Sequence, residues 1–247
     1  MGLNKIILAL PAYNEAENLR PLITEALRVF REQEYRYQII VVDDGSTDGT
    51  ADVLRELEGK GPVTMLSHGR NQGLGAAIST VLRAALSHVE SPENDVIVSM
   101  DADNTHDPSY IPAMVRRIEE GYDVVIASRF REGSEEVGVP LFRRLLSRGA
   151  RLLFRLFLRL PEVRDYTCGY RAYRASLLKE AFNKYGDSLI TRQGFACTDE
   201  LLVKLSTISR RMTEIPFVLR YDKKRSRSKL PLIRTVWETL KMLLLHR

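Results

Sequence analysis

Residues Val96 to Pro108 read VIVSMDADNTHDP, and this stretch decides how the rest of the chain is interpreted. The apolar run Val96–Met100 predicts a buried strand, and the carboxylates of Asp101 and Asp103 follow it. In open α/β sheets, ligands bind beside the carboxyl ends of the strands. Two carboxylates there repel each other unless positive charge lies between them, which a divalent cation such as Mg²⁺ or Mn²⁺ carrying a diphosphate would supply. A D-x-D pair by itself also occurs as a helix cap or a solvated turn.

The composition is that of an ordinary globular protein. The 247 residues are 44% hydrophobic and 28% charged, which allows one large domain or two small ones, and the net charge is +5. Cys168 and Cys197 lack the spacing of a zinc or redox site and predict free thiols in a reducing compartment. The apolar run at the N-terminus is too short for a signal peptide, and no apolar stretch reaches the ~18 residues of a membrane span. We therefore expect a cytoplasmic protein that is at most peripheral on the cytoplasmic membrane face.

Outward from Val96, apolar runs alternate with helical patterns. Further strands are expected at 6–10, 39–42, 63–66 and 124–127, with helical spacing between them. This alternation predicts a mostly parallel, Rossmann-like α/β sheet whose strand ends bring Asp44 together with the D-x-D pair. The first strand is not followed by G-x-G-x-x-G or G-x-x-x-x-G-K-[ST]. Phosphate is therefore expected to meet metal and basic side chains, not a glycine-rich cradle.

The second half is basic and amphipathic between Val137 and Pro161, where no Asp or Glu occurs. Five arginines recur there at spacings of 4, 3, 4 and 4, which places them on one helical stripe: Arg144, Arg148, Arg151, Arg155 and Arg159. The pattern is typical of a helix in a membrane interface. The alternative is a helix packed on the core with a solvated arginine face. Nucleic acid is disfavoured because no aromatic residues for base stacking are interleaved with the arginines.

The chain end repeats this pattern. Residues 221–229, YDKKRSRSK, form a dense basic loop, and residues 230–245 predict a final amphipathic helix that contains Trp237. Such a helix suits a membrane interface or a last layer on the core. The basic loop is either solvated or closed over a diphosphate.

Taken together, the motifs resemble those of family 2 glycosyltransferases with the GT-A fold, and within that family those of the dolichyl/polyprenyl-phosphate mannosyltransferases. They occur in order along essentially the whole chain. The motifs are Pro11-Ala12-Tyr13-Asn14-Glu15, Val42-Asp43-Asp44-Gly45-Ser46, Asn71-Gln72-Gly73-Leu74-Gly75, Asp101-Ala102-Asp103, Ser128-Arg129, Cys168-Gly169-Tyr170-Arg171-Ala172-Tyr173 and Ser228-Lys229.

The resemblance implies a role for each group of site residues. Asp101 and Asp103, with Ala102 between them, would meet the metal and the diphosphate. Glu200 would lie near the reacting sugar, with its role open. The residues implied to bind the base and ribose of a nucleotide sugar are Pro11, Tyr13, Glu15, Val42 and Asp44. The residues implied to bind the phosphates of donor and acceptor are Arg129, Arg171, Lys223, Arg225 and Lys229.

The implied activity is an inverting, metal-dependent transfer of a hexose, with mannose from GDP-mannose first among the donors, onto a polyprenyl phosphate. A phosphate acceptor is already an anion at neutral pH and needs positioning more than a general base. The implied organisation is a GT-A domain at 1–220, with a nucleotide-sugar half at 1–130 and an acceptor half at 131–220. Residues 221–247 would form the basic loop and the terminal helix.

Three departures from the family pattern leave questions open. The usual metal-ligating glutamine is Thr105 here, so the third metal ligand is in doubt. The usual arginine of the basic loop is Lys223, which keeps the charge but loses the bidentate geometry, so that Arg225 is a candidate for that contact. Many relatives continue into transmembrane helices, whereas this sequence ends at Arg247, so membrane contact would rest on the amphipathic segments or on an anchoring partner subunit.

Other functions fit parts of the sequence. A UDP-sugar donor of glucose or N-acetylglucosamine, or a non-lipid acceptor, keeps the chemistry and changes the substrates. Nucleotidyl transfer is disfavoured because PAYNE stands where a glycine-rich loop would be expected. A non-catalytic nucleotide-sugar-binding relative is disfavoured by the intact Asp44, Asp101 and Asp103.

Overall fold

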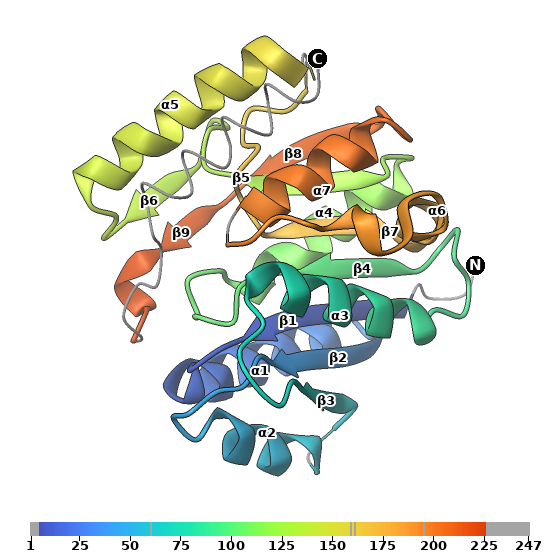
Figure 1. The fold of residues 1–247 in the computed structure, drawn as a ribbon, viewed down its shortest axis with the longest axis vertical. Coiled ribbons are helices and arrows are strands. Elements are labelled where there is room, and N and C mark those ends of the chain that lie inside the picture. Colours follow the sequence, from blue (N-terminus) through green and yellow to red (C-terminus); the bar gives the residue numbers. More distant parts are fainter. Residues whose placement is uncertain (1–4, 60, 159, 161, 195, 226–247) are drawn as a thin grey trace.

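The fold is centred on a single seven-stranded sheet (Figure 1). The computed structural model describes residues 5–59, 61–158, 160, 162–194 and 196–225. The expected terminal helix at 230–245, Lys229 and Arg159 therefore lie outside the described residues. The strands are β1 (Lys5–Ala12), β2 (Arg36–Asp43), β3 (Val63–Ser67), β4 (Val96–Ser99), β5 (Val124–Ser128), β6 (Glu135–Val137), β7 (Arg171–Arg174), β8 (Met212–Pro216) and β9 (Val218–Arg220).

The sheet order is β3-β2-β1-β4-β7-β5-β8. All neighbouring strands are parallel except β7, which is antiparallel to both β4 and β5. The five strands expected from the apolar runs are all present, so the mostly parallel α/β sheet is confirmed. The strands of the second half were not expected, and β7 and β8 complete the same sheet while β6 and β9 pair in a small separate one.

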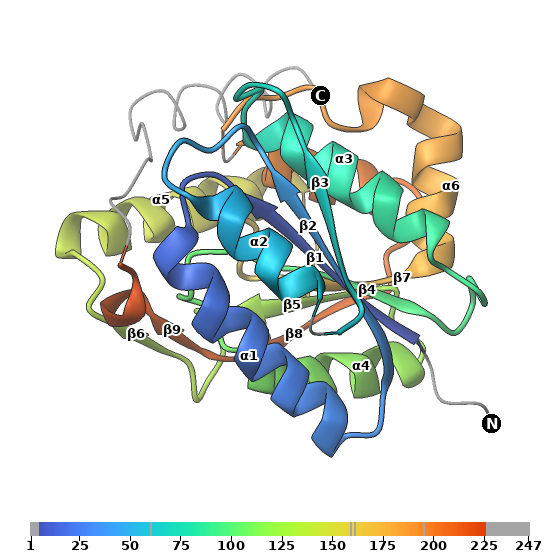
Figure 2. The same cartoon turned by 90° about the horizontal axis from the view of Figure 1, so that it is seen from below.

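Helices cover both faces of the sheet (Figure 2). The α-helices are α1 (Ala16–Glu32), α2 (Thr50–Glu58), α3 (Leu74–Ser87), α4 (Ile111–Glu119), α5 (Leu141–Leu158), α6 (Ala175–Tyr185) and α7 (Ala196–Ser206). Short 3₁₀ turns are η1 (Pro108–Tyr110), η2 (Gly186–Leu189) and η3 (Tyr221–Lys223). α1 and α4 lie on one face, and α3 and α6 lie on the other. The inner strands are buried on both sides, which explains why 6–10, 39–42 and 96–98 read as unbroken apolar runs.

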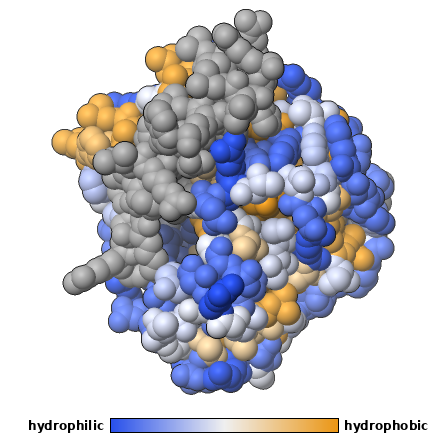
Figure 3. Space-filling view, in the orientation of Figure 1, coloured by the Kyte–Doolittle hydropathy of each residue, from blue (hydrophilic) through white to orange (hydrophobic). Residues whose placement is uncertain are grey.

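α5 lies at one end of the molecule and presents an apolar face outward (Figure 3). Its inner face holds Phe154, which is buried and stacks on Tyr166 with 5.2 Å between ring centroids. The large hydrophobic residues on its outer face are 62% to 76% exposed, and they are Leu141, Phe142, Leu145 and Leu152. Among the residues that the structure describes, no helix is both long enough and apolar enough to cross a bilayer.

The predicted arginine stripe of α5 is divided between the two sides of the helix. Arg144 is half-buried with its Nε 3.7 Å from a carboxylate oxygen of Glu136, and Arg151 lies over the ring of Phe130 at 4.9 Å. Arg148 and Arg155 are exposed beside the outward leucines. The helix thus combines features of both interpretations: Phe154 packs on the core, and the exposed residues include two arginines as well as large apolar side chains.

Candidate active site

Three strand ends meet where the predicted donor-binding residues lie. β1 pairs with β2 so that Pro11 is opposite Val42, and β4 pairs with β1 on the other side. Because the three strands are parallel, their carboxyl ends lie at one edge of the sheet. Tyr13 and Glu15 follow β1 there, Asp44 follows β2, and the D-x-D turn follows β4.

The D-x-D turn is held from within. Asp103 Oδ1 accepts hydrogen bonds from the Thr105 backbone N–H at 3.1 Å and from the Thr105 hydroxyl at 2.6 Å. Asn104 between them has φ 62°, a left-handed conformation that Asn tolerates. Thr105 is buried, so it shapes the turn by its contact with Asp103.

His106 fixes the start of the same turn, and the sequence reasoning missed it although it lies within the deciding stretch. The Asp101 backbone N–H donates to His106 Nδ1 at 3.2 Å. The imidazole is buried and stacks on Tyr170, with 5.2 Å between centroids, and meets Phe217 edge-on. His106 therefore anchors the D-x-D turn to the core.

The two carboxylates of the turn differ in their electrostatic surroundings. Burial raises the pKa of Asp101, and the adjacent Asp103 carboxylate adds to the rise. Burial also pushes the pKa of Asp103 upward, but the Lys224 ammonium outweighs burial and holds the pKa below its ordinary value. Lys224 Nζ donates directly to Asp103 Oδ2. The two carboxylates of Asp101 and Asp103 thus need positive charge nearby, and the Lys224 ammonium supplies it to Asp103.

That requirement fits a divalent cation. Over the described ranges, no three His, Cys, Asp or Glu side chains are grouped as a metal site. Asp101 and Asp103 would therefore hold a cation with oxygens of the diphosphate completing its shell, an arrangement that hard cations such as Mg²⁺ accept. Thr105, at the position of the expected third ligand, is engaged with Asp103.

Asp44 has a different environment at the end of β2. Its buried carboxylate accepts from the Gln72 N–H at 2.9 Å, from the Gly73 N–H at 2.8 Å and from His68 Nδ1 at 2.7 Å. The following Gly45 has φ +70°, and a Cβ there would lie 2.4 Å from the Arg70 carbonyl carbon. Asp44 therefore shapes the 71–75 turn that borders the donor-binding edge, and His68 is a partner that the sequence reasoning missed.

Glu200 is buried and clamps a second loop. Its carboxylate accepts from the Thr191 N–H at 2.7 Å, the Thr191 hydroxyl at 2.6 Å, the Arg192 N–H at 2.8 Å and Lys204 Nζ at 2.7 Å. Burial would raise the pKa of Glu200, but Lys204 and Thr191 hold it below its ordinary value. A Cβ on Gly75 would lie 2.3 Å from the Arg192 carbonyl oxygen, so this clamp supports the 71–75 turn from the other side.

The beginning of α7 borders the D-x-D pair. A Cβ on Gly169 would lie 3.4 Å from Asp101 Oδ1 and 3.8 Å from Thr198 Cγ2, which are ordinary van der Waals distances, so Gly169 and Thr198 lie directly beside the Asp101 carboxylate. Burial raises the pKa of the Cys197 thiol, and the carboxylates of Asp199, Glu200 and Asp101 contribute to the rise. Asp199 is thus a buried acid close to the site that the sequence reasoning did not select.

Two arginines predicted to meet phosphate are engaged elsewhere. Arg129 forms a bidentate pair with buried Asp165, with Nη2–Oδ1 at 2.6 Å and Nε–Oδ2 at 2.7 Å. Arg171 is fully buried and donates to the carbonyls of Thr198 at 2.7 Å and Tyr166 at 2.6 Å. The structure therefore places Arg171 in the core and not at an open phosphate site, and the charge of Arg129 is balanced by Asp165.

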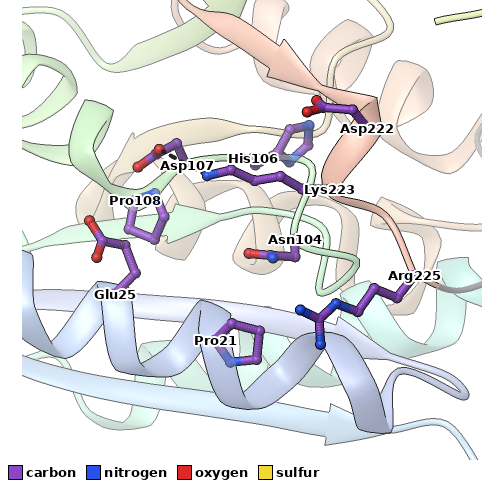
Figure 4. A pocket seen from close by; sticks show the side chains of 9 residues that line it. All are labelled: Pro21, Glu25, Asn104, His106, Asp107, Pro108, Asp222, Lys223 and Arg225. Carbon is purple, nitrogen blue, oxygen red and sulfur yellow. Dashed lines mark ion pairs between the residues drawn. The ribbon is translucent and has the colours of Figure 1, made fainter. Parts of the chain in front are cut away.

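The basic segment after β9 does reach the site (Figure 4). A hollow of about 580 Å³ lies between α1, the loop after Asp103 and residues 222–225. Lys223 points across it to Asp107, with Nζ 3.8 Å from Oδ2, and Arg225 extends toward α1. Asn104 and His106 line the hollow, whereas the predicted base- and ribose-binding residues do not.

Comparison with known proteins decides the family. The family model described as Glycosyl transferase family 2 matches residues 8–182, which is more than half of the chain. This chain belongs to glycosyl transferase family 2. The expectation that the chain is a family 2 glycosyltransferase is therefore confirmed.

Two curated relatives of this glycosyltransferase act on polyprenyl phosphates by name. The dolichol-phosphate mannosyltransferase of Pyrococcus furiosus is 31% identical over 214 residues, which cover 86% of this chain and 56% of that protein. The undecaprenyl-phosphate mannosyltransferase of Micrococcus luteus is 32% identical over 213 residues, which cover 86% of this chain and 82% of that protein. The chain therefore spans little more than half the length of the first and most of the second.

Solved structures confirm the GT-A fold. Mannosyl-3-phosphoglycerate synthase from Rubrobacter xylanophilus matches with a TM-score of 0.67 at 22% identity, over 99% of this chain and 74% of that chain. Glucosyl-3-phosphoglycerate synthase from Mycobacterium tuberculosis, in complex with Mn²⁺, UDP and phosphoglyceric acid, matches with a TM-score of 0.66 at 22% identity. That match covers 99% of this chain and 78% of the other.

Proposed function

We propose that this glycosyltransferase moves a hexose from a nucleoside diphosphate sugar onto a polyprenyl phosphate, with GDP-mannose as the first donor to test. The transfer would be a single displacement with inversion, dependent on Mg²⁺ or Mn²⁺ at Asp101 and Asp103. The observation that carries the proposal is the carboxylate pair at the sheet edge, whose negative charge needs a cation. The mannosyltransferases at about 30% identity support the choice of sugar and acceptor.

The chain's own residues suit an acceptor that needs no general base. A phosphate oxygen of the acceptor would form the new bond to the anomeric carbon, while the bond from that carbon to the donor diphosphate breaks and the diphosphate leaves with the electron pair. A bound divalent cation would neutralise the departing diphosphate. Glu200 already accepts four hydrogen bonds, two of them from Thr191 and one from Lys204, which suits it to hold a loop and not to take a proton.

The outward face of α5 supports a lipid acceptor. Four large apolar side chains stand exposed on it beside two exposed arginines, Arg148 and Arg155. Apolar side chains next to cations are the pattern of a helix lying in the interface of an anionic membrane. We therefore place the enzyme peripherally on the cytoplasmic membrane face, with α5 as the contact and an anchoring partner subunit as the other route to the membrane.

The test is a transfer assay with labelled GDP-mannose and UDP-glucose. Each donor is mixed with the full chain and Mn²⁺ or Mg²⁺, with and without a short-chain polyprenyl phosphate. Lipid-dependent release of the nucleoside diphosphate from GDP-mannose is the expected result, and release only from UDP-glucose would change the donor. Binding of a nucleotide sugar without lipid-dependent turnover would contradict polyprenyl phosphate as the acceptor. No binding of any nucleotide sugar would indicate that the chain is a non-catalytic relative.

The membrane contact has its own test. Leu145→Glu and Leu152→Glu should each weaken co-sedimentation with vesicles that contain anionic lipid, because each puts a carboxylate on the apolar face. Glu58→Gln, an exposed change far from α5, is the control and should sediment like the wild type. If all variants bind vesicles equally, α5 is not the membrane contact, and an anchoring partner subunit becomes the favoured route to the membrane.

A further inference from the structure

Lys224 contacts the D-x-D turn through an ion pair with Asp103. Neither the family match nor the sequence pattern gives Lys224 a role there. Its ammonium donates to Asp103 Oδ2, and the two side chains are only 13% and 14% exposed. Asp103 Oδ1 already accepts both donors of Thr105. Both carboxylate oxygens of Asp103 are therefore engaged.

The two partners of Asp103 differ in how they are attached. Thr105 is two residues away on the same turn, so it cannot leave Asp103 without undoing the turn. Lys224 comes from the segment after β9, more than a hundred residues along the chain. A divalent cation at Asp103 Oδ2 would therefore compete with Lys224, because two positive charges on one oxygen repel each other.

The segment that carries Lys224 also crosses the donor-binding edge. The Arg225 N–H donates to Asn18 Oδ1 at 3.2 Å, and Asn18 Nδ2 donates to Glu15 Oε2 at 2.7 Å. The base of the segment is tied to the D-x-D loop by the bond from the Arg220 N–H to the Thr105 carbonyl at 3.0 Å. Lys224 and Arg225 thus bridge the residues that follow β1 and those that follow β4.

We propose that Lys224 is a tethered competitor of the divalent cation: its ammonium balances Asp103 until a cation with its diphosphate displaces it and frees residues 224–225 from the donor-binding edge. This inference rests on the proposed function only in taking Asp101 and Asp103 as the cation-binding pair. Binding of the cation at Asp103 and release of residues 224–225 from the donor-binding edge would then occur together. Lys224 would act as a positioning residue that keeps the site closed before the donor arrives.

The experiment is a titration of the full chain with Mn²⁺ alone, followed by electron paramagnetic resonance of the free ion. Lys224→Gln should bind Mn²⁺ roughly tenfold more tightly than the wild type, because apparent affinity falls with the fraction of molecules in which the site is blocked. Lys223→Gln is the matched control. It removes the same charge from the neighbouring residue, whose ammonium lies 3.8 Å from Asp107 and not on Asp103. Lys224→Arg should return the affinity to the wild-type value.

The outcomes separate this inference from the proposed function. If Lys224→Gln and Lys223→Gln bind Mn²⁺ equally, while Asp103→Asn abolishes binding, the cation site stands and the role of Lys224 is overturned. If Asp103→Asn leaves binding unchanged, the cation site itself fails. Hydrogen exchange at the Arg225 amide gives a second measurement: Mn²⁺ with GDP should accelerate it in the wild type, and it should already be fast in Lys224→Gln. Unchanged exchange in both would also overturn the inference.

Discussion

The ends of β2 and β4 both place aspartates at the same edge of the sheet, but buried Asp44 and half-buried Asp103 have different partners. Asp44 is held by two backbone N–H groups and by His68, all within 29 residues of it. Asp103 has Thr105 as a local partner on one oxygen, but its other oxygen is balanced by Lys224, 121 residues away, on a segment outside the seven-stranded sheet. Asp44 is thus satisfied entirely by its neighbours in sequence, whereas half of the Asp103 carboxylate depends on a distant cation. The comparison predicts that substitutions at the two ends will affect different properties.

The largest expected effect is on activity at the β4 end. Asp103→Asn should lower kcat/KM by at least roughly a hundredfold, because it removes the charge that we propose to hold the cation and diphosphate. Its free energy of unfolding should fall by about 1–2 kcal/mol, because the asparagine oxygen can keep both Thr105 bonds while the charged bond from Lys224 is lost. Transfer assays and urea unfolding measure the two effects. Asp107→Asn is the control in the same loop, because asparagine keeps the cap that Asp107 provides to Ser109. If Asp103→Asn unfolds so easily that unfolding accounts for its loss of activity, the proposed difference between the β2 and β4 ends is contradicted.

The next largest effect is on stability at the β2 end. Asp44→Asn should lower the free energy of unfolding by about 2–3 kcal/mol, because an amide NH₂ would face a buried N–H donor and a charge-assisted bond would be lost. Urea unfolding at neutral pH measures the change. Asp52→Asn removes a carboxylate that is 76% exposed and should stay within about 0.5 kcal/mol of the wild type. If Asp44→Asn is as stable as Asp52→Asn, Asp44 is not a scaffold residue.

The same contrast explains what the sequence could predict. Apolar runs and strand-end acids are local patterns, so the five expected strands and the position of the D-x-D turn were recovered. β7 was missed because RAYR has an arginine at each end and no apolar run. Arg171 can be buried because it donates to the carbonyls of Tyr166 and Thr198, and half-buried Arg174 pairs with Asp123.

Partners distant in the sequence also determine the surroundings of the predicted site residues. Arg129 was expected at phosphate, but Asp165 lies 36 residues further on and takes its charge. The pairing of Lys224 with Asp103 has no local signature at all. A basic loop in the sequence carries no information about which of its cations reaches which acid.

A smaller effect is expected at Glu200, where stability should depend on pH. The folded-state pKa of Glu200 lies below its ordinary value of 4.5, so its contribution to stability is present above that value and is lost as the pH falls through the lowered pKa. Glu200→Gln should be less stable than the wild type by about 1–2 kcal/mol at pH 7, through the lost pair with Lys204. The difference should narrow as the pH falls below 4.5 in a series of urea unfolding experiments. A difference that stays constant with pH would mean that the charge of Glu200 does not stabilise the loop.

The smallest effect is expected from the outermost contact of the β2 cluster. Since a carboxylate only accepts, the Asp44 contact requires a proton on His68 Nδ1, and Nε2 lies 3.0 Å from the Thr80 hydroxyl. Thr80→Val should therefore lower the free energy of unfolding by about 1 kcal/mol, less than Asp44→Asn, because it removes one bond and leaves the carboxylate satisfied. Nitrogen NMR of the imidazole should show the Nδ1–H tautomer in both proteins. An Nε2–H tautomer would mean that His68 does not donate to Asp44, and the scaffold at the end of β2 would then depend on the backbone of Gln72 and Gly73 alone.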